Sequence, residues 1–81
     1  GLYAEALLLY RRGLEIQEAV LGPDHPWLAN SLNNIAIIHY SLGDYPAARA
    51  LFERALAVRE QALGPAHPVV ADTLGNLAAI Y

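Results

Sequence analysis

The sequence predicts an all-α protein built as an α-solenoid of four helices in antiparallel pairs. The chain holds two similar copies, because residues 1–39 align with residues 43–81 without a gap and 17 of these 39 pairs are identical. Between the breaks in each copy, apolar residues recur at the i, i+3, i+4 spacing of a helix. The breaks are Gly-Pro and Gly-Asp steps. Each copy is therefore expected to form one pair of helices.

The first helix is expected over residues 2–21. Gly22 can take the left-handed conformation that ends a helix, and Pro23 cannot continue one. The apolar side chains fall on two adjacent stripes, so this side of the helix is expected to face a neighbour. The stripes consist of Leu2, Ala6, Leu9, Gly13 and Ile16, and of Tyr3, Leu7, Tyr10 and Leu14.

The second helix is expected over about residues 26–41 and ends before Gly43. Pro26 suits its first position, because the missing N–H of proline would have no partner there in any case. One face of this helix is apolar and is expected to lie in the core. That face consists of Leu28, Ala29, Leu32, Ile35, Ala36 and His39.

The third helix is expected over about residues 44–62, with Asp44 as its N-cap, and the fourth from Pro68 to the end. Two ion pairs at i, i+4 spacing are expected on helix surfaces, each worth only tenths of a kcal/mol. They are Arg11–Glu15 and Arg49–Glu53.

The motif Leu-Gly-Pro-x-His-Pro occurs twice, 42 residues apart, and marks the same joint in both copies. Leu21 and Leu63 are expected to pack, and His25 and His67 to lie near the N-caps of the helices that follow. The two histidines are a full copy apart, roughly 10 Å or more for helices that pack 8–10 Å from one another. Zinc needs ligands at about 2 Å, so they are not expected to share a metal.

The second and third expected helices carry a spaced set of large and small side chains: Leu32, Ile35, Ala36, His39, Gly43, Tyr45, Ala48, Phe52 and Ala55. This set resembles the tetratricopeptide repeat, and the 42-residue period resembles that of kinesin light chains. The resemblance implies right-handed superhelical stacking in which the first-type (A) helices line a concave surface. The helix order is B-A-B-A, so residues 1–81 form one segment of two repeats, 1–42 and 43–81, incomplete or permuted at the ends.

Composition excludes several classes of function. Five arginines, no lysine and eight acids give a net charge of −3, which offers no basic footprint for nucleic acid. No apolar run reaches the roughly 18–20 residues of a membrane span, and no signal peptide is recognisable. There is no cysteine, no catalytic triad and no phosphate-binding loop. A cytoplasmic, non-catalytic protein without a cofactor is therefore expected.

The resemblance implies a peptide-binding groove on the A helices. Asn34 and Asn76 lie one repeat apart, and a side-chain amide offers the donor and the acceptor that clamp a peptide backbone. The alternative is that these asparagines join neighbouring helices. Arg59 matches a groove arginine that can pair with an acidic ligand. Its alternative is a solvated side chain favoured by the helix dipole.

Other candidate groove residues follow the usual pattern of the A helices, and they suit an extended peptide with one apolar anchor. Where the family can carry lysine, this chain has Asn30 and Asp72, so the groove is less basic than a site for acidic peptides requires. Trp27 is expected to pack on the preceding helix or else to anchor an interface. The remaining candidates are Asn33, Ile37, Tyr40 and Ser41 on the second expected helix and Thr73, Gly75 and Ala79 on the fourth.

A structural role is the rival function. Hydrophobic residues make up 56% of a chain too small to hide so much apolar surface. The first expected helix is of the B type and lacks an A helix before it, and the last is of the A type and lacks a B helix after it. A head-to-tail contact between chains, or a reciprocal exchange of helices between two chains, would supply both missing partners. The sequence thus predicts either a scaffold for a protein or peptide ligand or a self-associating repeat, with no nucleic-acid or membrane partner.

Overall fold

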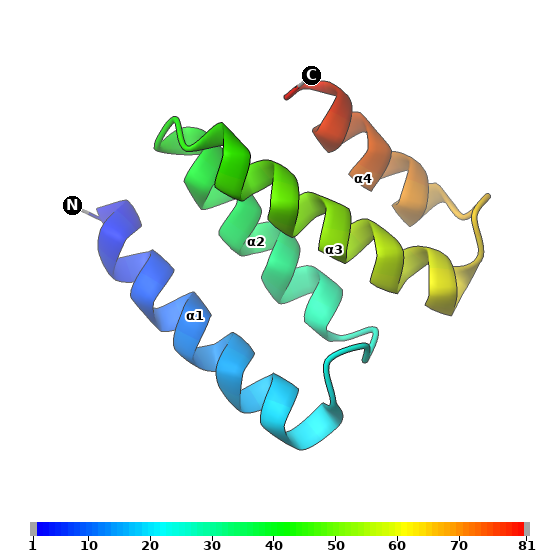
Figure 1. The fold of residues 1–81 in the computed structure, drawn as a ribbon, viewed down its shortest axis with the longest axis horizontal. Coiled ribbons are helices and arrows are strands. Elements are labelled where there is room, and N and C mark those ends of the chain that lie inside the picture. Colours follow the sequence, from blue (N-terminus) through cyan, green and yellow to red (C-terminus); the bar gives the residue numbers. More distant parts are fainter. Residues whose placement is uncertain (1, 81) are drawn as a thin grey trace.

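The computed structural model describes residues 2–80 and contains the four helices that the sequence predicts. They are α1 (Leu2–Leu21), α2 (Leu28–Ser41), α3 (Tyr45–Leu63) and α4 (Pro68–Ala78). Each helix packs on the one before it in the sequence. In Figure 1, α2 and α3 form the centre, while α1 and α4 lie on opposite outer sides. The molecule is a thin slab, with principal extents of 37 × 33 × 16 Å.

The core lies where α2 crosses its neighbours. The whole predicted apolar face of α2 is buried, including His39, which is 6% exposed. Phe52 of α3 is 2% exposed and packs with Ala36, Ala48 and Leu77, so one ring joins three helices. Small residues at 36 and 48 let the backbones approach closely, and Phe52 fills the space between them, as the repeat motif predicts.

Glycine ends the helices as predicted. Gly22, Gly43 and Gly64 have φ of +88°, +82° and +87°, a region that L-residues with a Cβ rarely adopt. Three details differ from expectation. Helix α4 ends at Ala78, and residues 79–80 form a turn, instead of continuing the helix to the end of the chain. Helix α2 begins at Leu28 rather than at Pro26, because residues 26–27 form a turn in which Leu28 donates to the carbonyl of His25. Leu63 remains 45% exposed instead of packing.

Both joint histidines act as acceptors for the backbone. Nδ1 of His67 accepts from the amide of Val69 at 3.1 Å, and Nδ1 of His25 accepts from the amide of Trp27 at 3.1 Å. The imidazole nitrogen thus accepts the hydrogen bond from an otherwise unpaired N–H that a Ser or Asp side chain usually accepts at a helix start. This role explains why histidine recurs in the motif.

We expect His67→Ala to lower the free energy of unfolding by about 1 kcal/mol, the usual cost of losing an N-cap acceptor. His67→Asn should recover most of that loss, because its amide oxygen can accept the same N–H. Urea denaturation followed by circular dichroism measures both. An alanine variant as stable as the wild type would show that the imidazole does not cap α4.

Arg11 makes a different contact from the predicted one. Its Nη2 lies 3.0 Å from Nε2 of His39, rather than pairing with Glu15. Arginine has only donors, so Nε2 accepts and the ring proton lies on Nδ1, which is 3.5 Å from Oδ2 of Asp44. This chain of contacts links α1, the end of α2 and the start of α3. The other predicted pair, Arg49–Glu53, forms at 3.0 Å.

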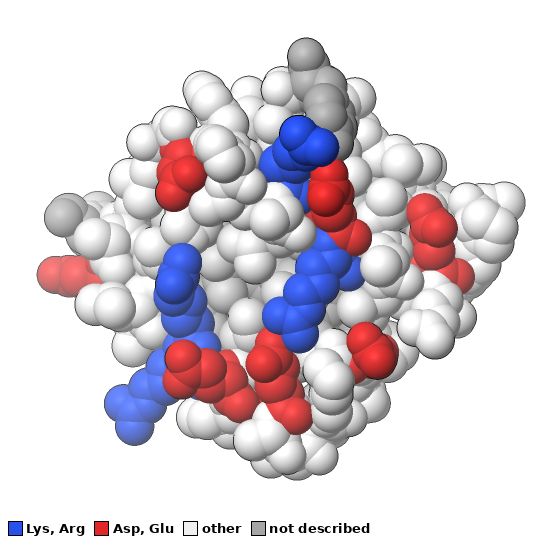
Figure 2. Space-filling view, viewed as in Figure 1, with Lys and Arg blue, Asp and Glu red and all other residues white. Residues whose placement is uncertain are grey.

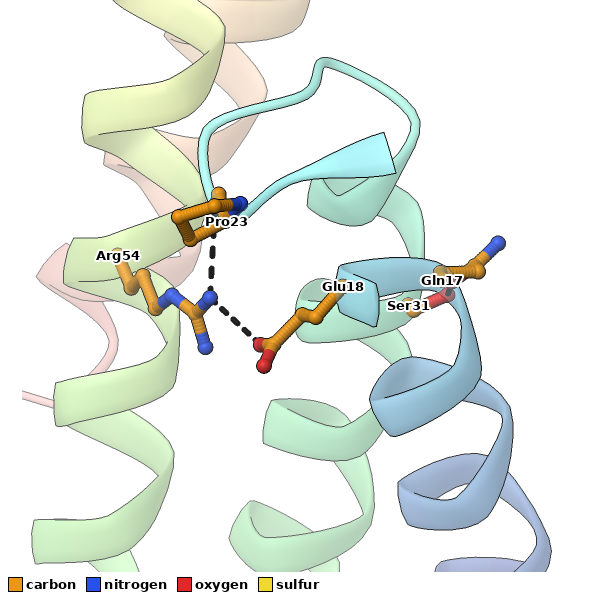
Figure 3. Close-up of polar contacts among 5 residues, drawn as sticks. All are labelled: Gln17, Glu18, Pro23, Ser31 and Arg54. Atoms are coloured by element: carbon orange, nitrogen blue, oxygen red, sulfur yellow. Dashed lines mark hydrogen bonds and ion pairs between the residues drawn. The ribbon is translucent and has the colours of Figure 1, made fainter. Parts of the chain in front are cut away.

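One ion pair joins the two copies. Nη2 of Arg54 on α3 donates to Oε1 of Glu18 on α1 at 2.6 Å, and to the carbonyl of Pro23 at 3.4 Å (Figure 3). The two side chains are 39% and 33% exposed, so solvent screens the attraction. A double-mutant cycle of Arg54→Ala and Glu18→Ala should give a coupling of about 0.2–1 kcal/mol. A coupling of zero would contradict this contact.

Candidate functional site

Four of the predicted groove residues form a single stripe on α2. Asn30, Asn33, Ile37 and Tyr40 are spaced by three, four and three residues, which places them on one face of a helix. Three of them are exposed and Asn33 is partly buried, in contrast to the core face of the same helix. The stripe is therefore open to a partner.

Arg59 lies at one end of this stripe and is not a free surface side chain. Its Nη1 donates to Oγ1 of Thr73 at 2.7 Å, and its Nη2 donates to Oδ1 of Asn30 at 3.1 Å. Arg59 thus ties α3 to both α4 and α2, and the alternative of a solvated arginine is wrong. Thr73 is itself fully buried and also donates to the carbonyl of Val69.

The contact between Arg59 and Thr73 has a counterpart in the first copy. Ser31 donates to Oε1 of Gln17 at 2.7 Å, and these residues align with Thr73 and Arg59 (Figure 3). Each pair joins the end of a B helix to the following A helix. The sequence carried a signal for it, because both copies keep a long polar residue and a hydroxyl 14 positions apart.

The two asparagines predicted to be equivalent have different surroundings. Nδ2 of Asn76 on α4 donates to Oδ1 of Asn33 on α2 at 3.4 Å. Asn34, which aligns with Asn76, is exposed. Within residues 2–80, no hydrogen bond joins Asn34 or Asp72 to the group around Arg59. The structure therefore brings together six of the eight predicted residues: Asn30, Asn33, Ile37, Tyr40, Arg59 and Asn76.

A shallow hollow opens at the other end of the stripe, with a volume of about 140 Å³. Its walls are Ile37 and Tyr40 of α2 and Asn76 of α4, with Phe52 and Ala79 completing it. Tyr40 also meets Tyr45 edge to face, with ring centroids 5.2 Å apart. Ala79 was among the groove residues expected on the fourth helix, whereas sequence reasoning placed Phe52 only in the packing between helices, since the hollow exists only where three helices meet.

A hollow of this size excludes some ligands. Sites for cofactors and drug-sized molecules enclose about 300–1,000 Å³, whereas a cavity of about 150 Å³ holds a group the size of benzene. The opening thus fits one aliphatic or aromatic side chain. Because its wall also carries the amide of Asn76, an apolar side chain can enter while the attached backbone meets a donor and an acceptor.

Trp27 lines a shallow hollow at the end of α1 together with Ile16, Gln17, Val20 and Leu21. It remains 66% exposed and meets His25 edge to face at 5.1 Å. Its ring therefore covers the end of α1 only in part.

The charged side chains are scattered rather than gathered by sign (Figure 2). Figure 2 shows acidic and basic side chains interleaved on the face that it presents, without a broad basic patch. Among residues 2–80, no cluster of three or more His, Asp or Glu side chains is placed to hold a metal ion. Over the same residues, no helix is both long and apolar enough to cross a bilayer.

A row of antiparallel helices with small residues at the crossings, an aromatic wedge and an open stripe on the A helices defines a helical-repeat interaction module. The sequence profile of the tetratricopeptide repeat family matches residues 1–61 and 33–81, which together cover the whole chain. The chain belongs to the tetratricopeptide repeat family.

One curated relative is human Nephrocystin-3. It is 49% identical to this chain over 39 residues, which are 48% of this chain and 3% of that protein. The chain therefore spans a very small part of the relative that it matches.

Proposed function

We propose that this chain is a non-catalytic interaction module that binds an extended peptide of a partner protein across α2 and α4. The observation that carries the proposal is the stripe on α2, which leads from the Arg59 cluster through the Asn33–Asn76 pair to the apolar hollow. Members of the family serve as protein interaction scaffolds, and this arrangement supplies the required elements.

The chemistry of the stripe defines the peptide. The hollow takes one apolar side chain, and the amides of Asn33 and Asn76 meet the backbone beside it. Arg59 already donates to Thr73 and Asn30, so a ligand carboxylate must compete with these contacts. We therefore expect a peptide with an apolar anchor and no run of acidic residues.

Selection from a displayed random peptide library, followed by calorimetric titration of one enriched peptide, tests the proposal. Replacing Asn33 and Asn76 together with alanine should weaken binding about tenfold, because two backbone contacts are lost. Gln61→Ala, an exposed amide on α3, is the matched control and should bind like the wild type. If the double variant melts at a lower temperature but binds unchanged, the asparagines only join helices and the proposal fails.

Self-association is the second function that we propose, because one specific observation favours it. Among the described residues, α1 contains no buried residue, and Leu9 and Ile16 are 72% and 58% exposed. Large exposed apolar side chains two turns apart on one face of a helix are typical of an interface. Sedimentation velocity over a concentration series tests this function, and a constant monomer would contradict it.

A further inference from the structure

We propose that two copies of this chain join head to tail, with α1 of one copy packing on α4 of another in the way that α3 packs on α2. This inference rests on the proposed self-association and names its partner and register. The template is internal, because α2 and α4 are equivalent helices of the two copies, and so are α1 and α3.

Burial on the A helices shows which face of α4 is unfilled. Leu32 is 0% exposed because Ala55 of α3 packs on it, whereas the equivalent Leu74 is 48% exposed. Ala36 is buried by Phe52 and Ala48, whereas the equivalent Ala78 is exposed. Helix α4 therefore presents the same apolar face that α3 covers on α2.

The B helices α3 and α1 also differ in the exposure of their equivalent apolar residues. Phe52, Ala55 and Val58 of α3 are all 3% exposed or less. Their equivalents on α1 are Tyr10, Gly13 and Ile16, and all three are exposed. Helix α1 thus carries an uncovered version of the face that α3 uses.

Charge fixes the register. Glu18 of the first copy pairs with Arg54 of the second, and both residues are repeated, as Glu60 and Arg12. Both are exposed, and within residues 2–80 neither side chain makes a hydrogen bond or ion pair. In the proposed contact, Glu60 of one chain meets Arg12 of the next. That Arg12 also reaches the carbonyl of Pro65, as Arg54 reaches that of Pro23.

A second polar contact follows from the same equivalence. Arg59 donates to Asn30 across the internal joint, and the corresponding residues at the new joint are Gln17 of the next copy and Asp72. Only the amide oxygen of Gln17 is used by Ser31, so its NH₂ group can donate to the exposed carboxylate of Asp72. In this register the Asp72 carboxylate gains a partner, whereas within the described part of a single chain it has none.

The contact joins two different surfaces, the face of α1 and the face of α4. Each added copy therefore again exposes one uncovered face of each kind, and the assembly grows. Wild-type chain in sedimentation velocity should therefore form species larger than a dimer as its concentration rises. Leu74→Glu places a charge in the centre of the contact and should abolish association. Because Leu74 is half exposed in the single chain, this variant should keep its helical circular dichroism signal.

A charge swap tests the register. Glu60→Arg and Arg12→Glu each put like charges together and should weaken association about five- to tenfold. An equimolar mixture should associate like the wild type, since Arg at 60 then meets Glu at 12 at one joint and the native pair forms at the next. Asp24→Arg changes the net charge equally, lies outside the contact and should have no effect.

The outcomes separate the two claims. A chain that stays monomeric at every concentration overturns both the self-association and this inference. A chain that associates, but whose single charge variants are unaffected or are not rescued by mixing, overturns the head-to-tail register alone. Weakened single variants and a restored mixture support the inference.

Discussion

Phe52→Ala is expected to lower the free energy of unfolding by about 3–5 kcal/mol, the usual cost of deleting a buried phenyl ring. The ring is 2% exposed and touches buried residues of α2 and α4 as well as of its own helix. A chain of 81 residues is stable by only about 4–12 kcal/mol at 0.05–0.15 kcal/mol per residue. The variant should therefore lose a large share of this stability, with a much lower urea concentration at half-unfolding.

The control for this substitution is Leu8→Ala. Leu8 is 71% exposed, and the equivalent residue of the second copy is already an alanine, Ala50, which is also exposed. The change should cost less than about 0.5 kcal/mol. Equal losses from both substitutions would contradict the central position of Phe52.

Much of the fold was predictable, because local chemistry determines it. Glycine and proline at the joints fixed the helix ends to within a few residues, and the i, i+3, i+4 pattern identified the core face of α2. Pro26 was the exception, since residues 26–27 form a turn in which Leu28 donates to the carbonyl of His25, and the helix begins only at Leu28. The preference of Pro26 for the first position of a helix is therefore weaker than the turn that this hydrogen bond closes.

The candidate site was less accessible from the sequence. The face of α2 follows from periodicity, but the partners of Arg59 depend on where three helices cross. The ion pair between Glu18 and Arg54 had a readable signal, because both positions are identical in the two copies although neither lies in the core. At these two positions, the polar identity between the copies marks a contact between them.

Periodicity also cannot say whether a neighbour covers a face. The stripes of α1 and α3 look alike in the sequence, yet α1 has no buried residue within the described chain and α3 has four. The difference arises because α3 lies between two A helices, whereas α1 contacts one. Stability should therefore be uneven along the solenoid, with the outer helices opening first.

Leu32 and Leu74 give the sharpest test of this unevenness, because the same residue occupies equivalent positions with different surroundings. Leu32→Ala is expected to cost about 2–5 kcal/mol, since the side chain is 0% exposed and its removal leaves a cavity beside Leu28 and Ala55. Leu74→Ala should cost less than about 1 kcal/mol in the dilute single chain, because the side chain is 48% exposed.

Urea denaturation at low protein concentration measures this pair of values, and similar losses would show that both leucines are covered in the single chain. The difference between the two losses of unfolding free energy should also change with protein concentration. If another copy covers α4, the loss from Leu74→Ala should rise with protein concentration, since the wild type gains stability by association and the variant gains less. The loss from Leu32→Ala should change much less, because α3 covers Leu32 whether or not a second chain is present.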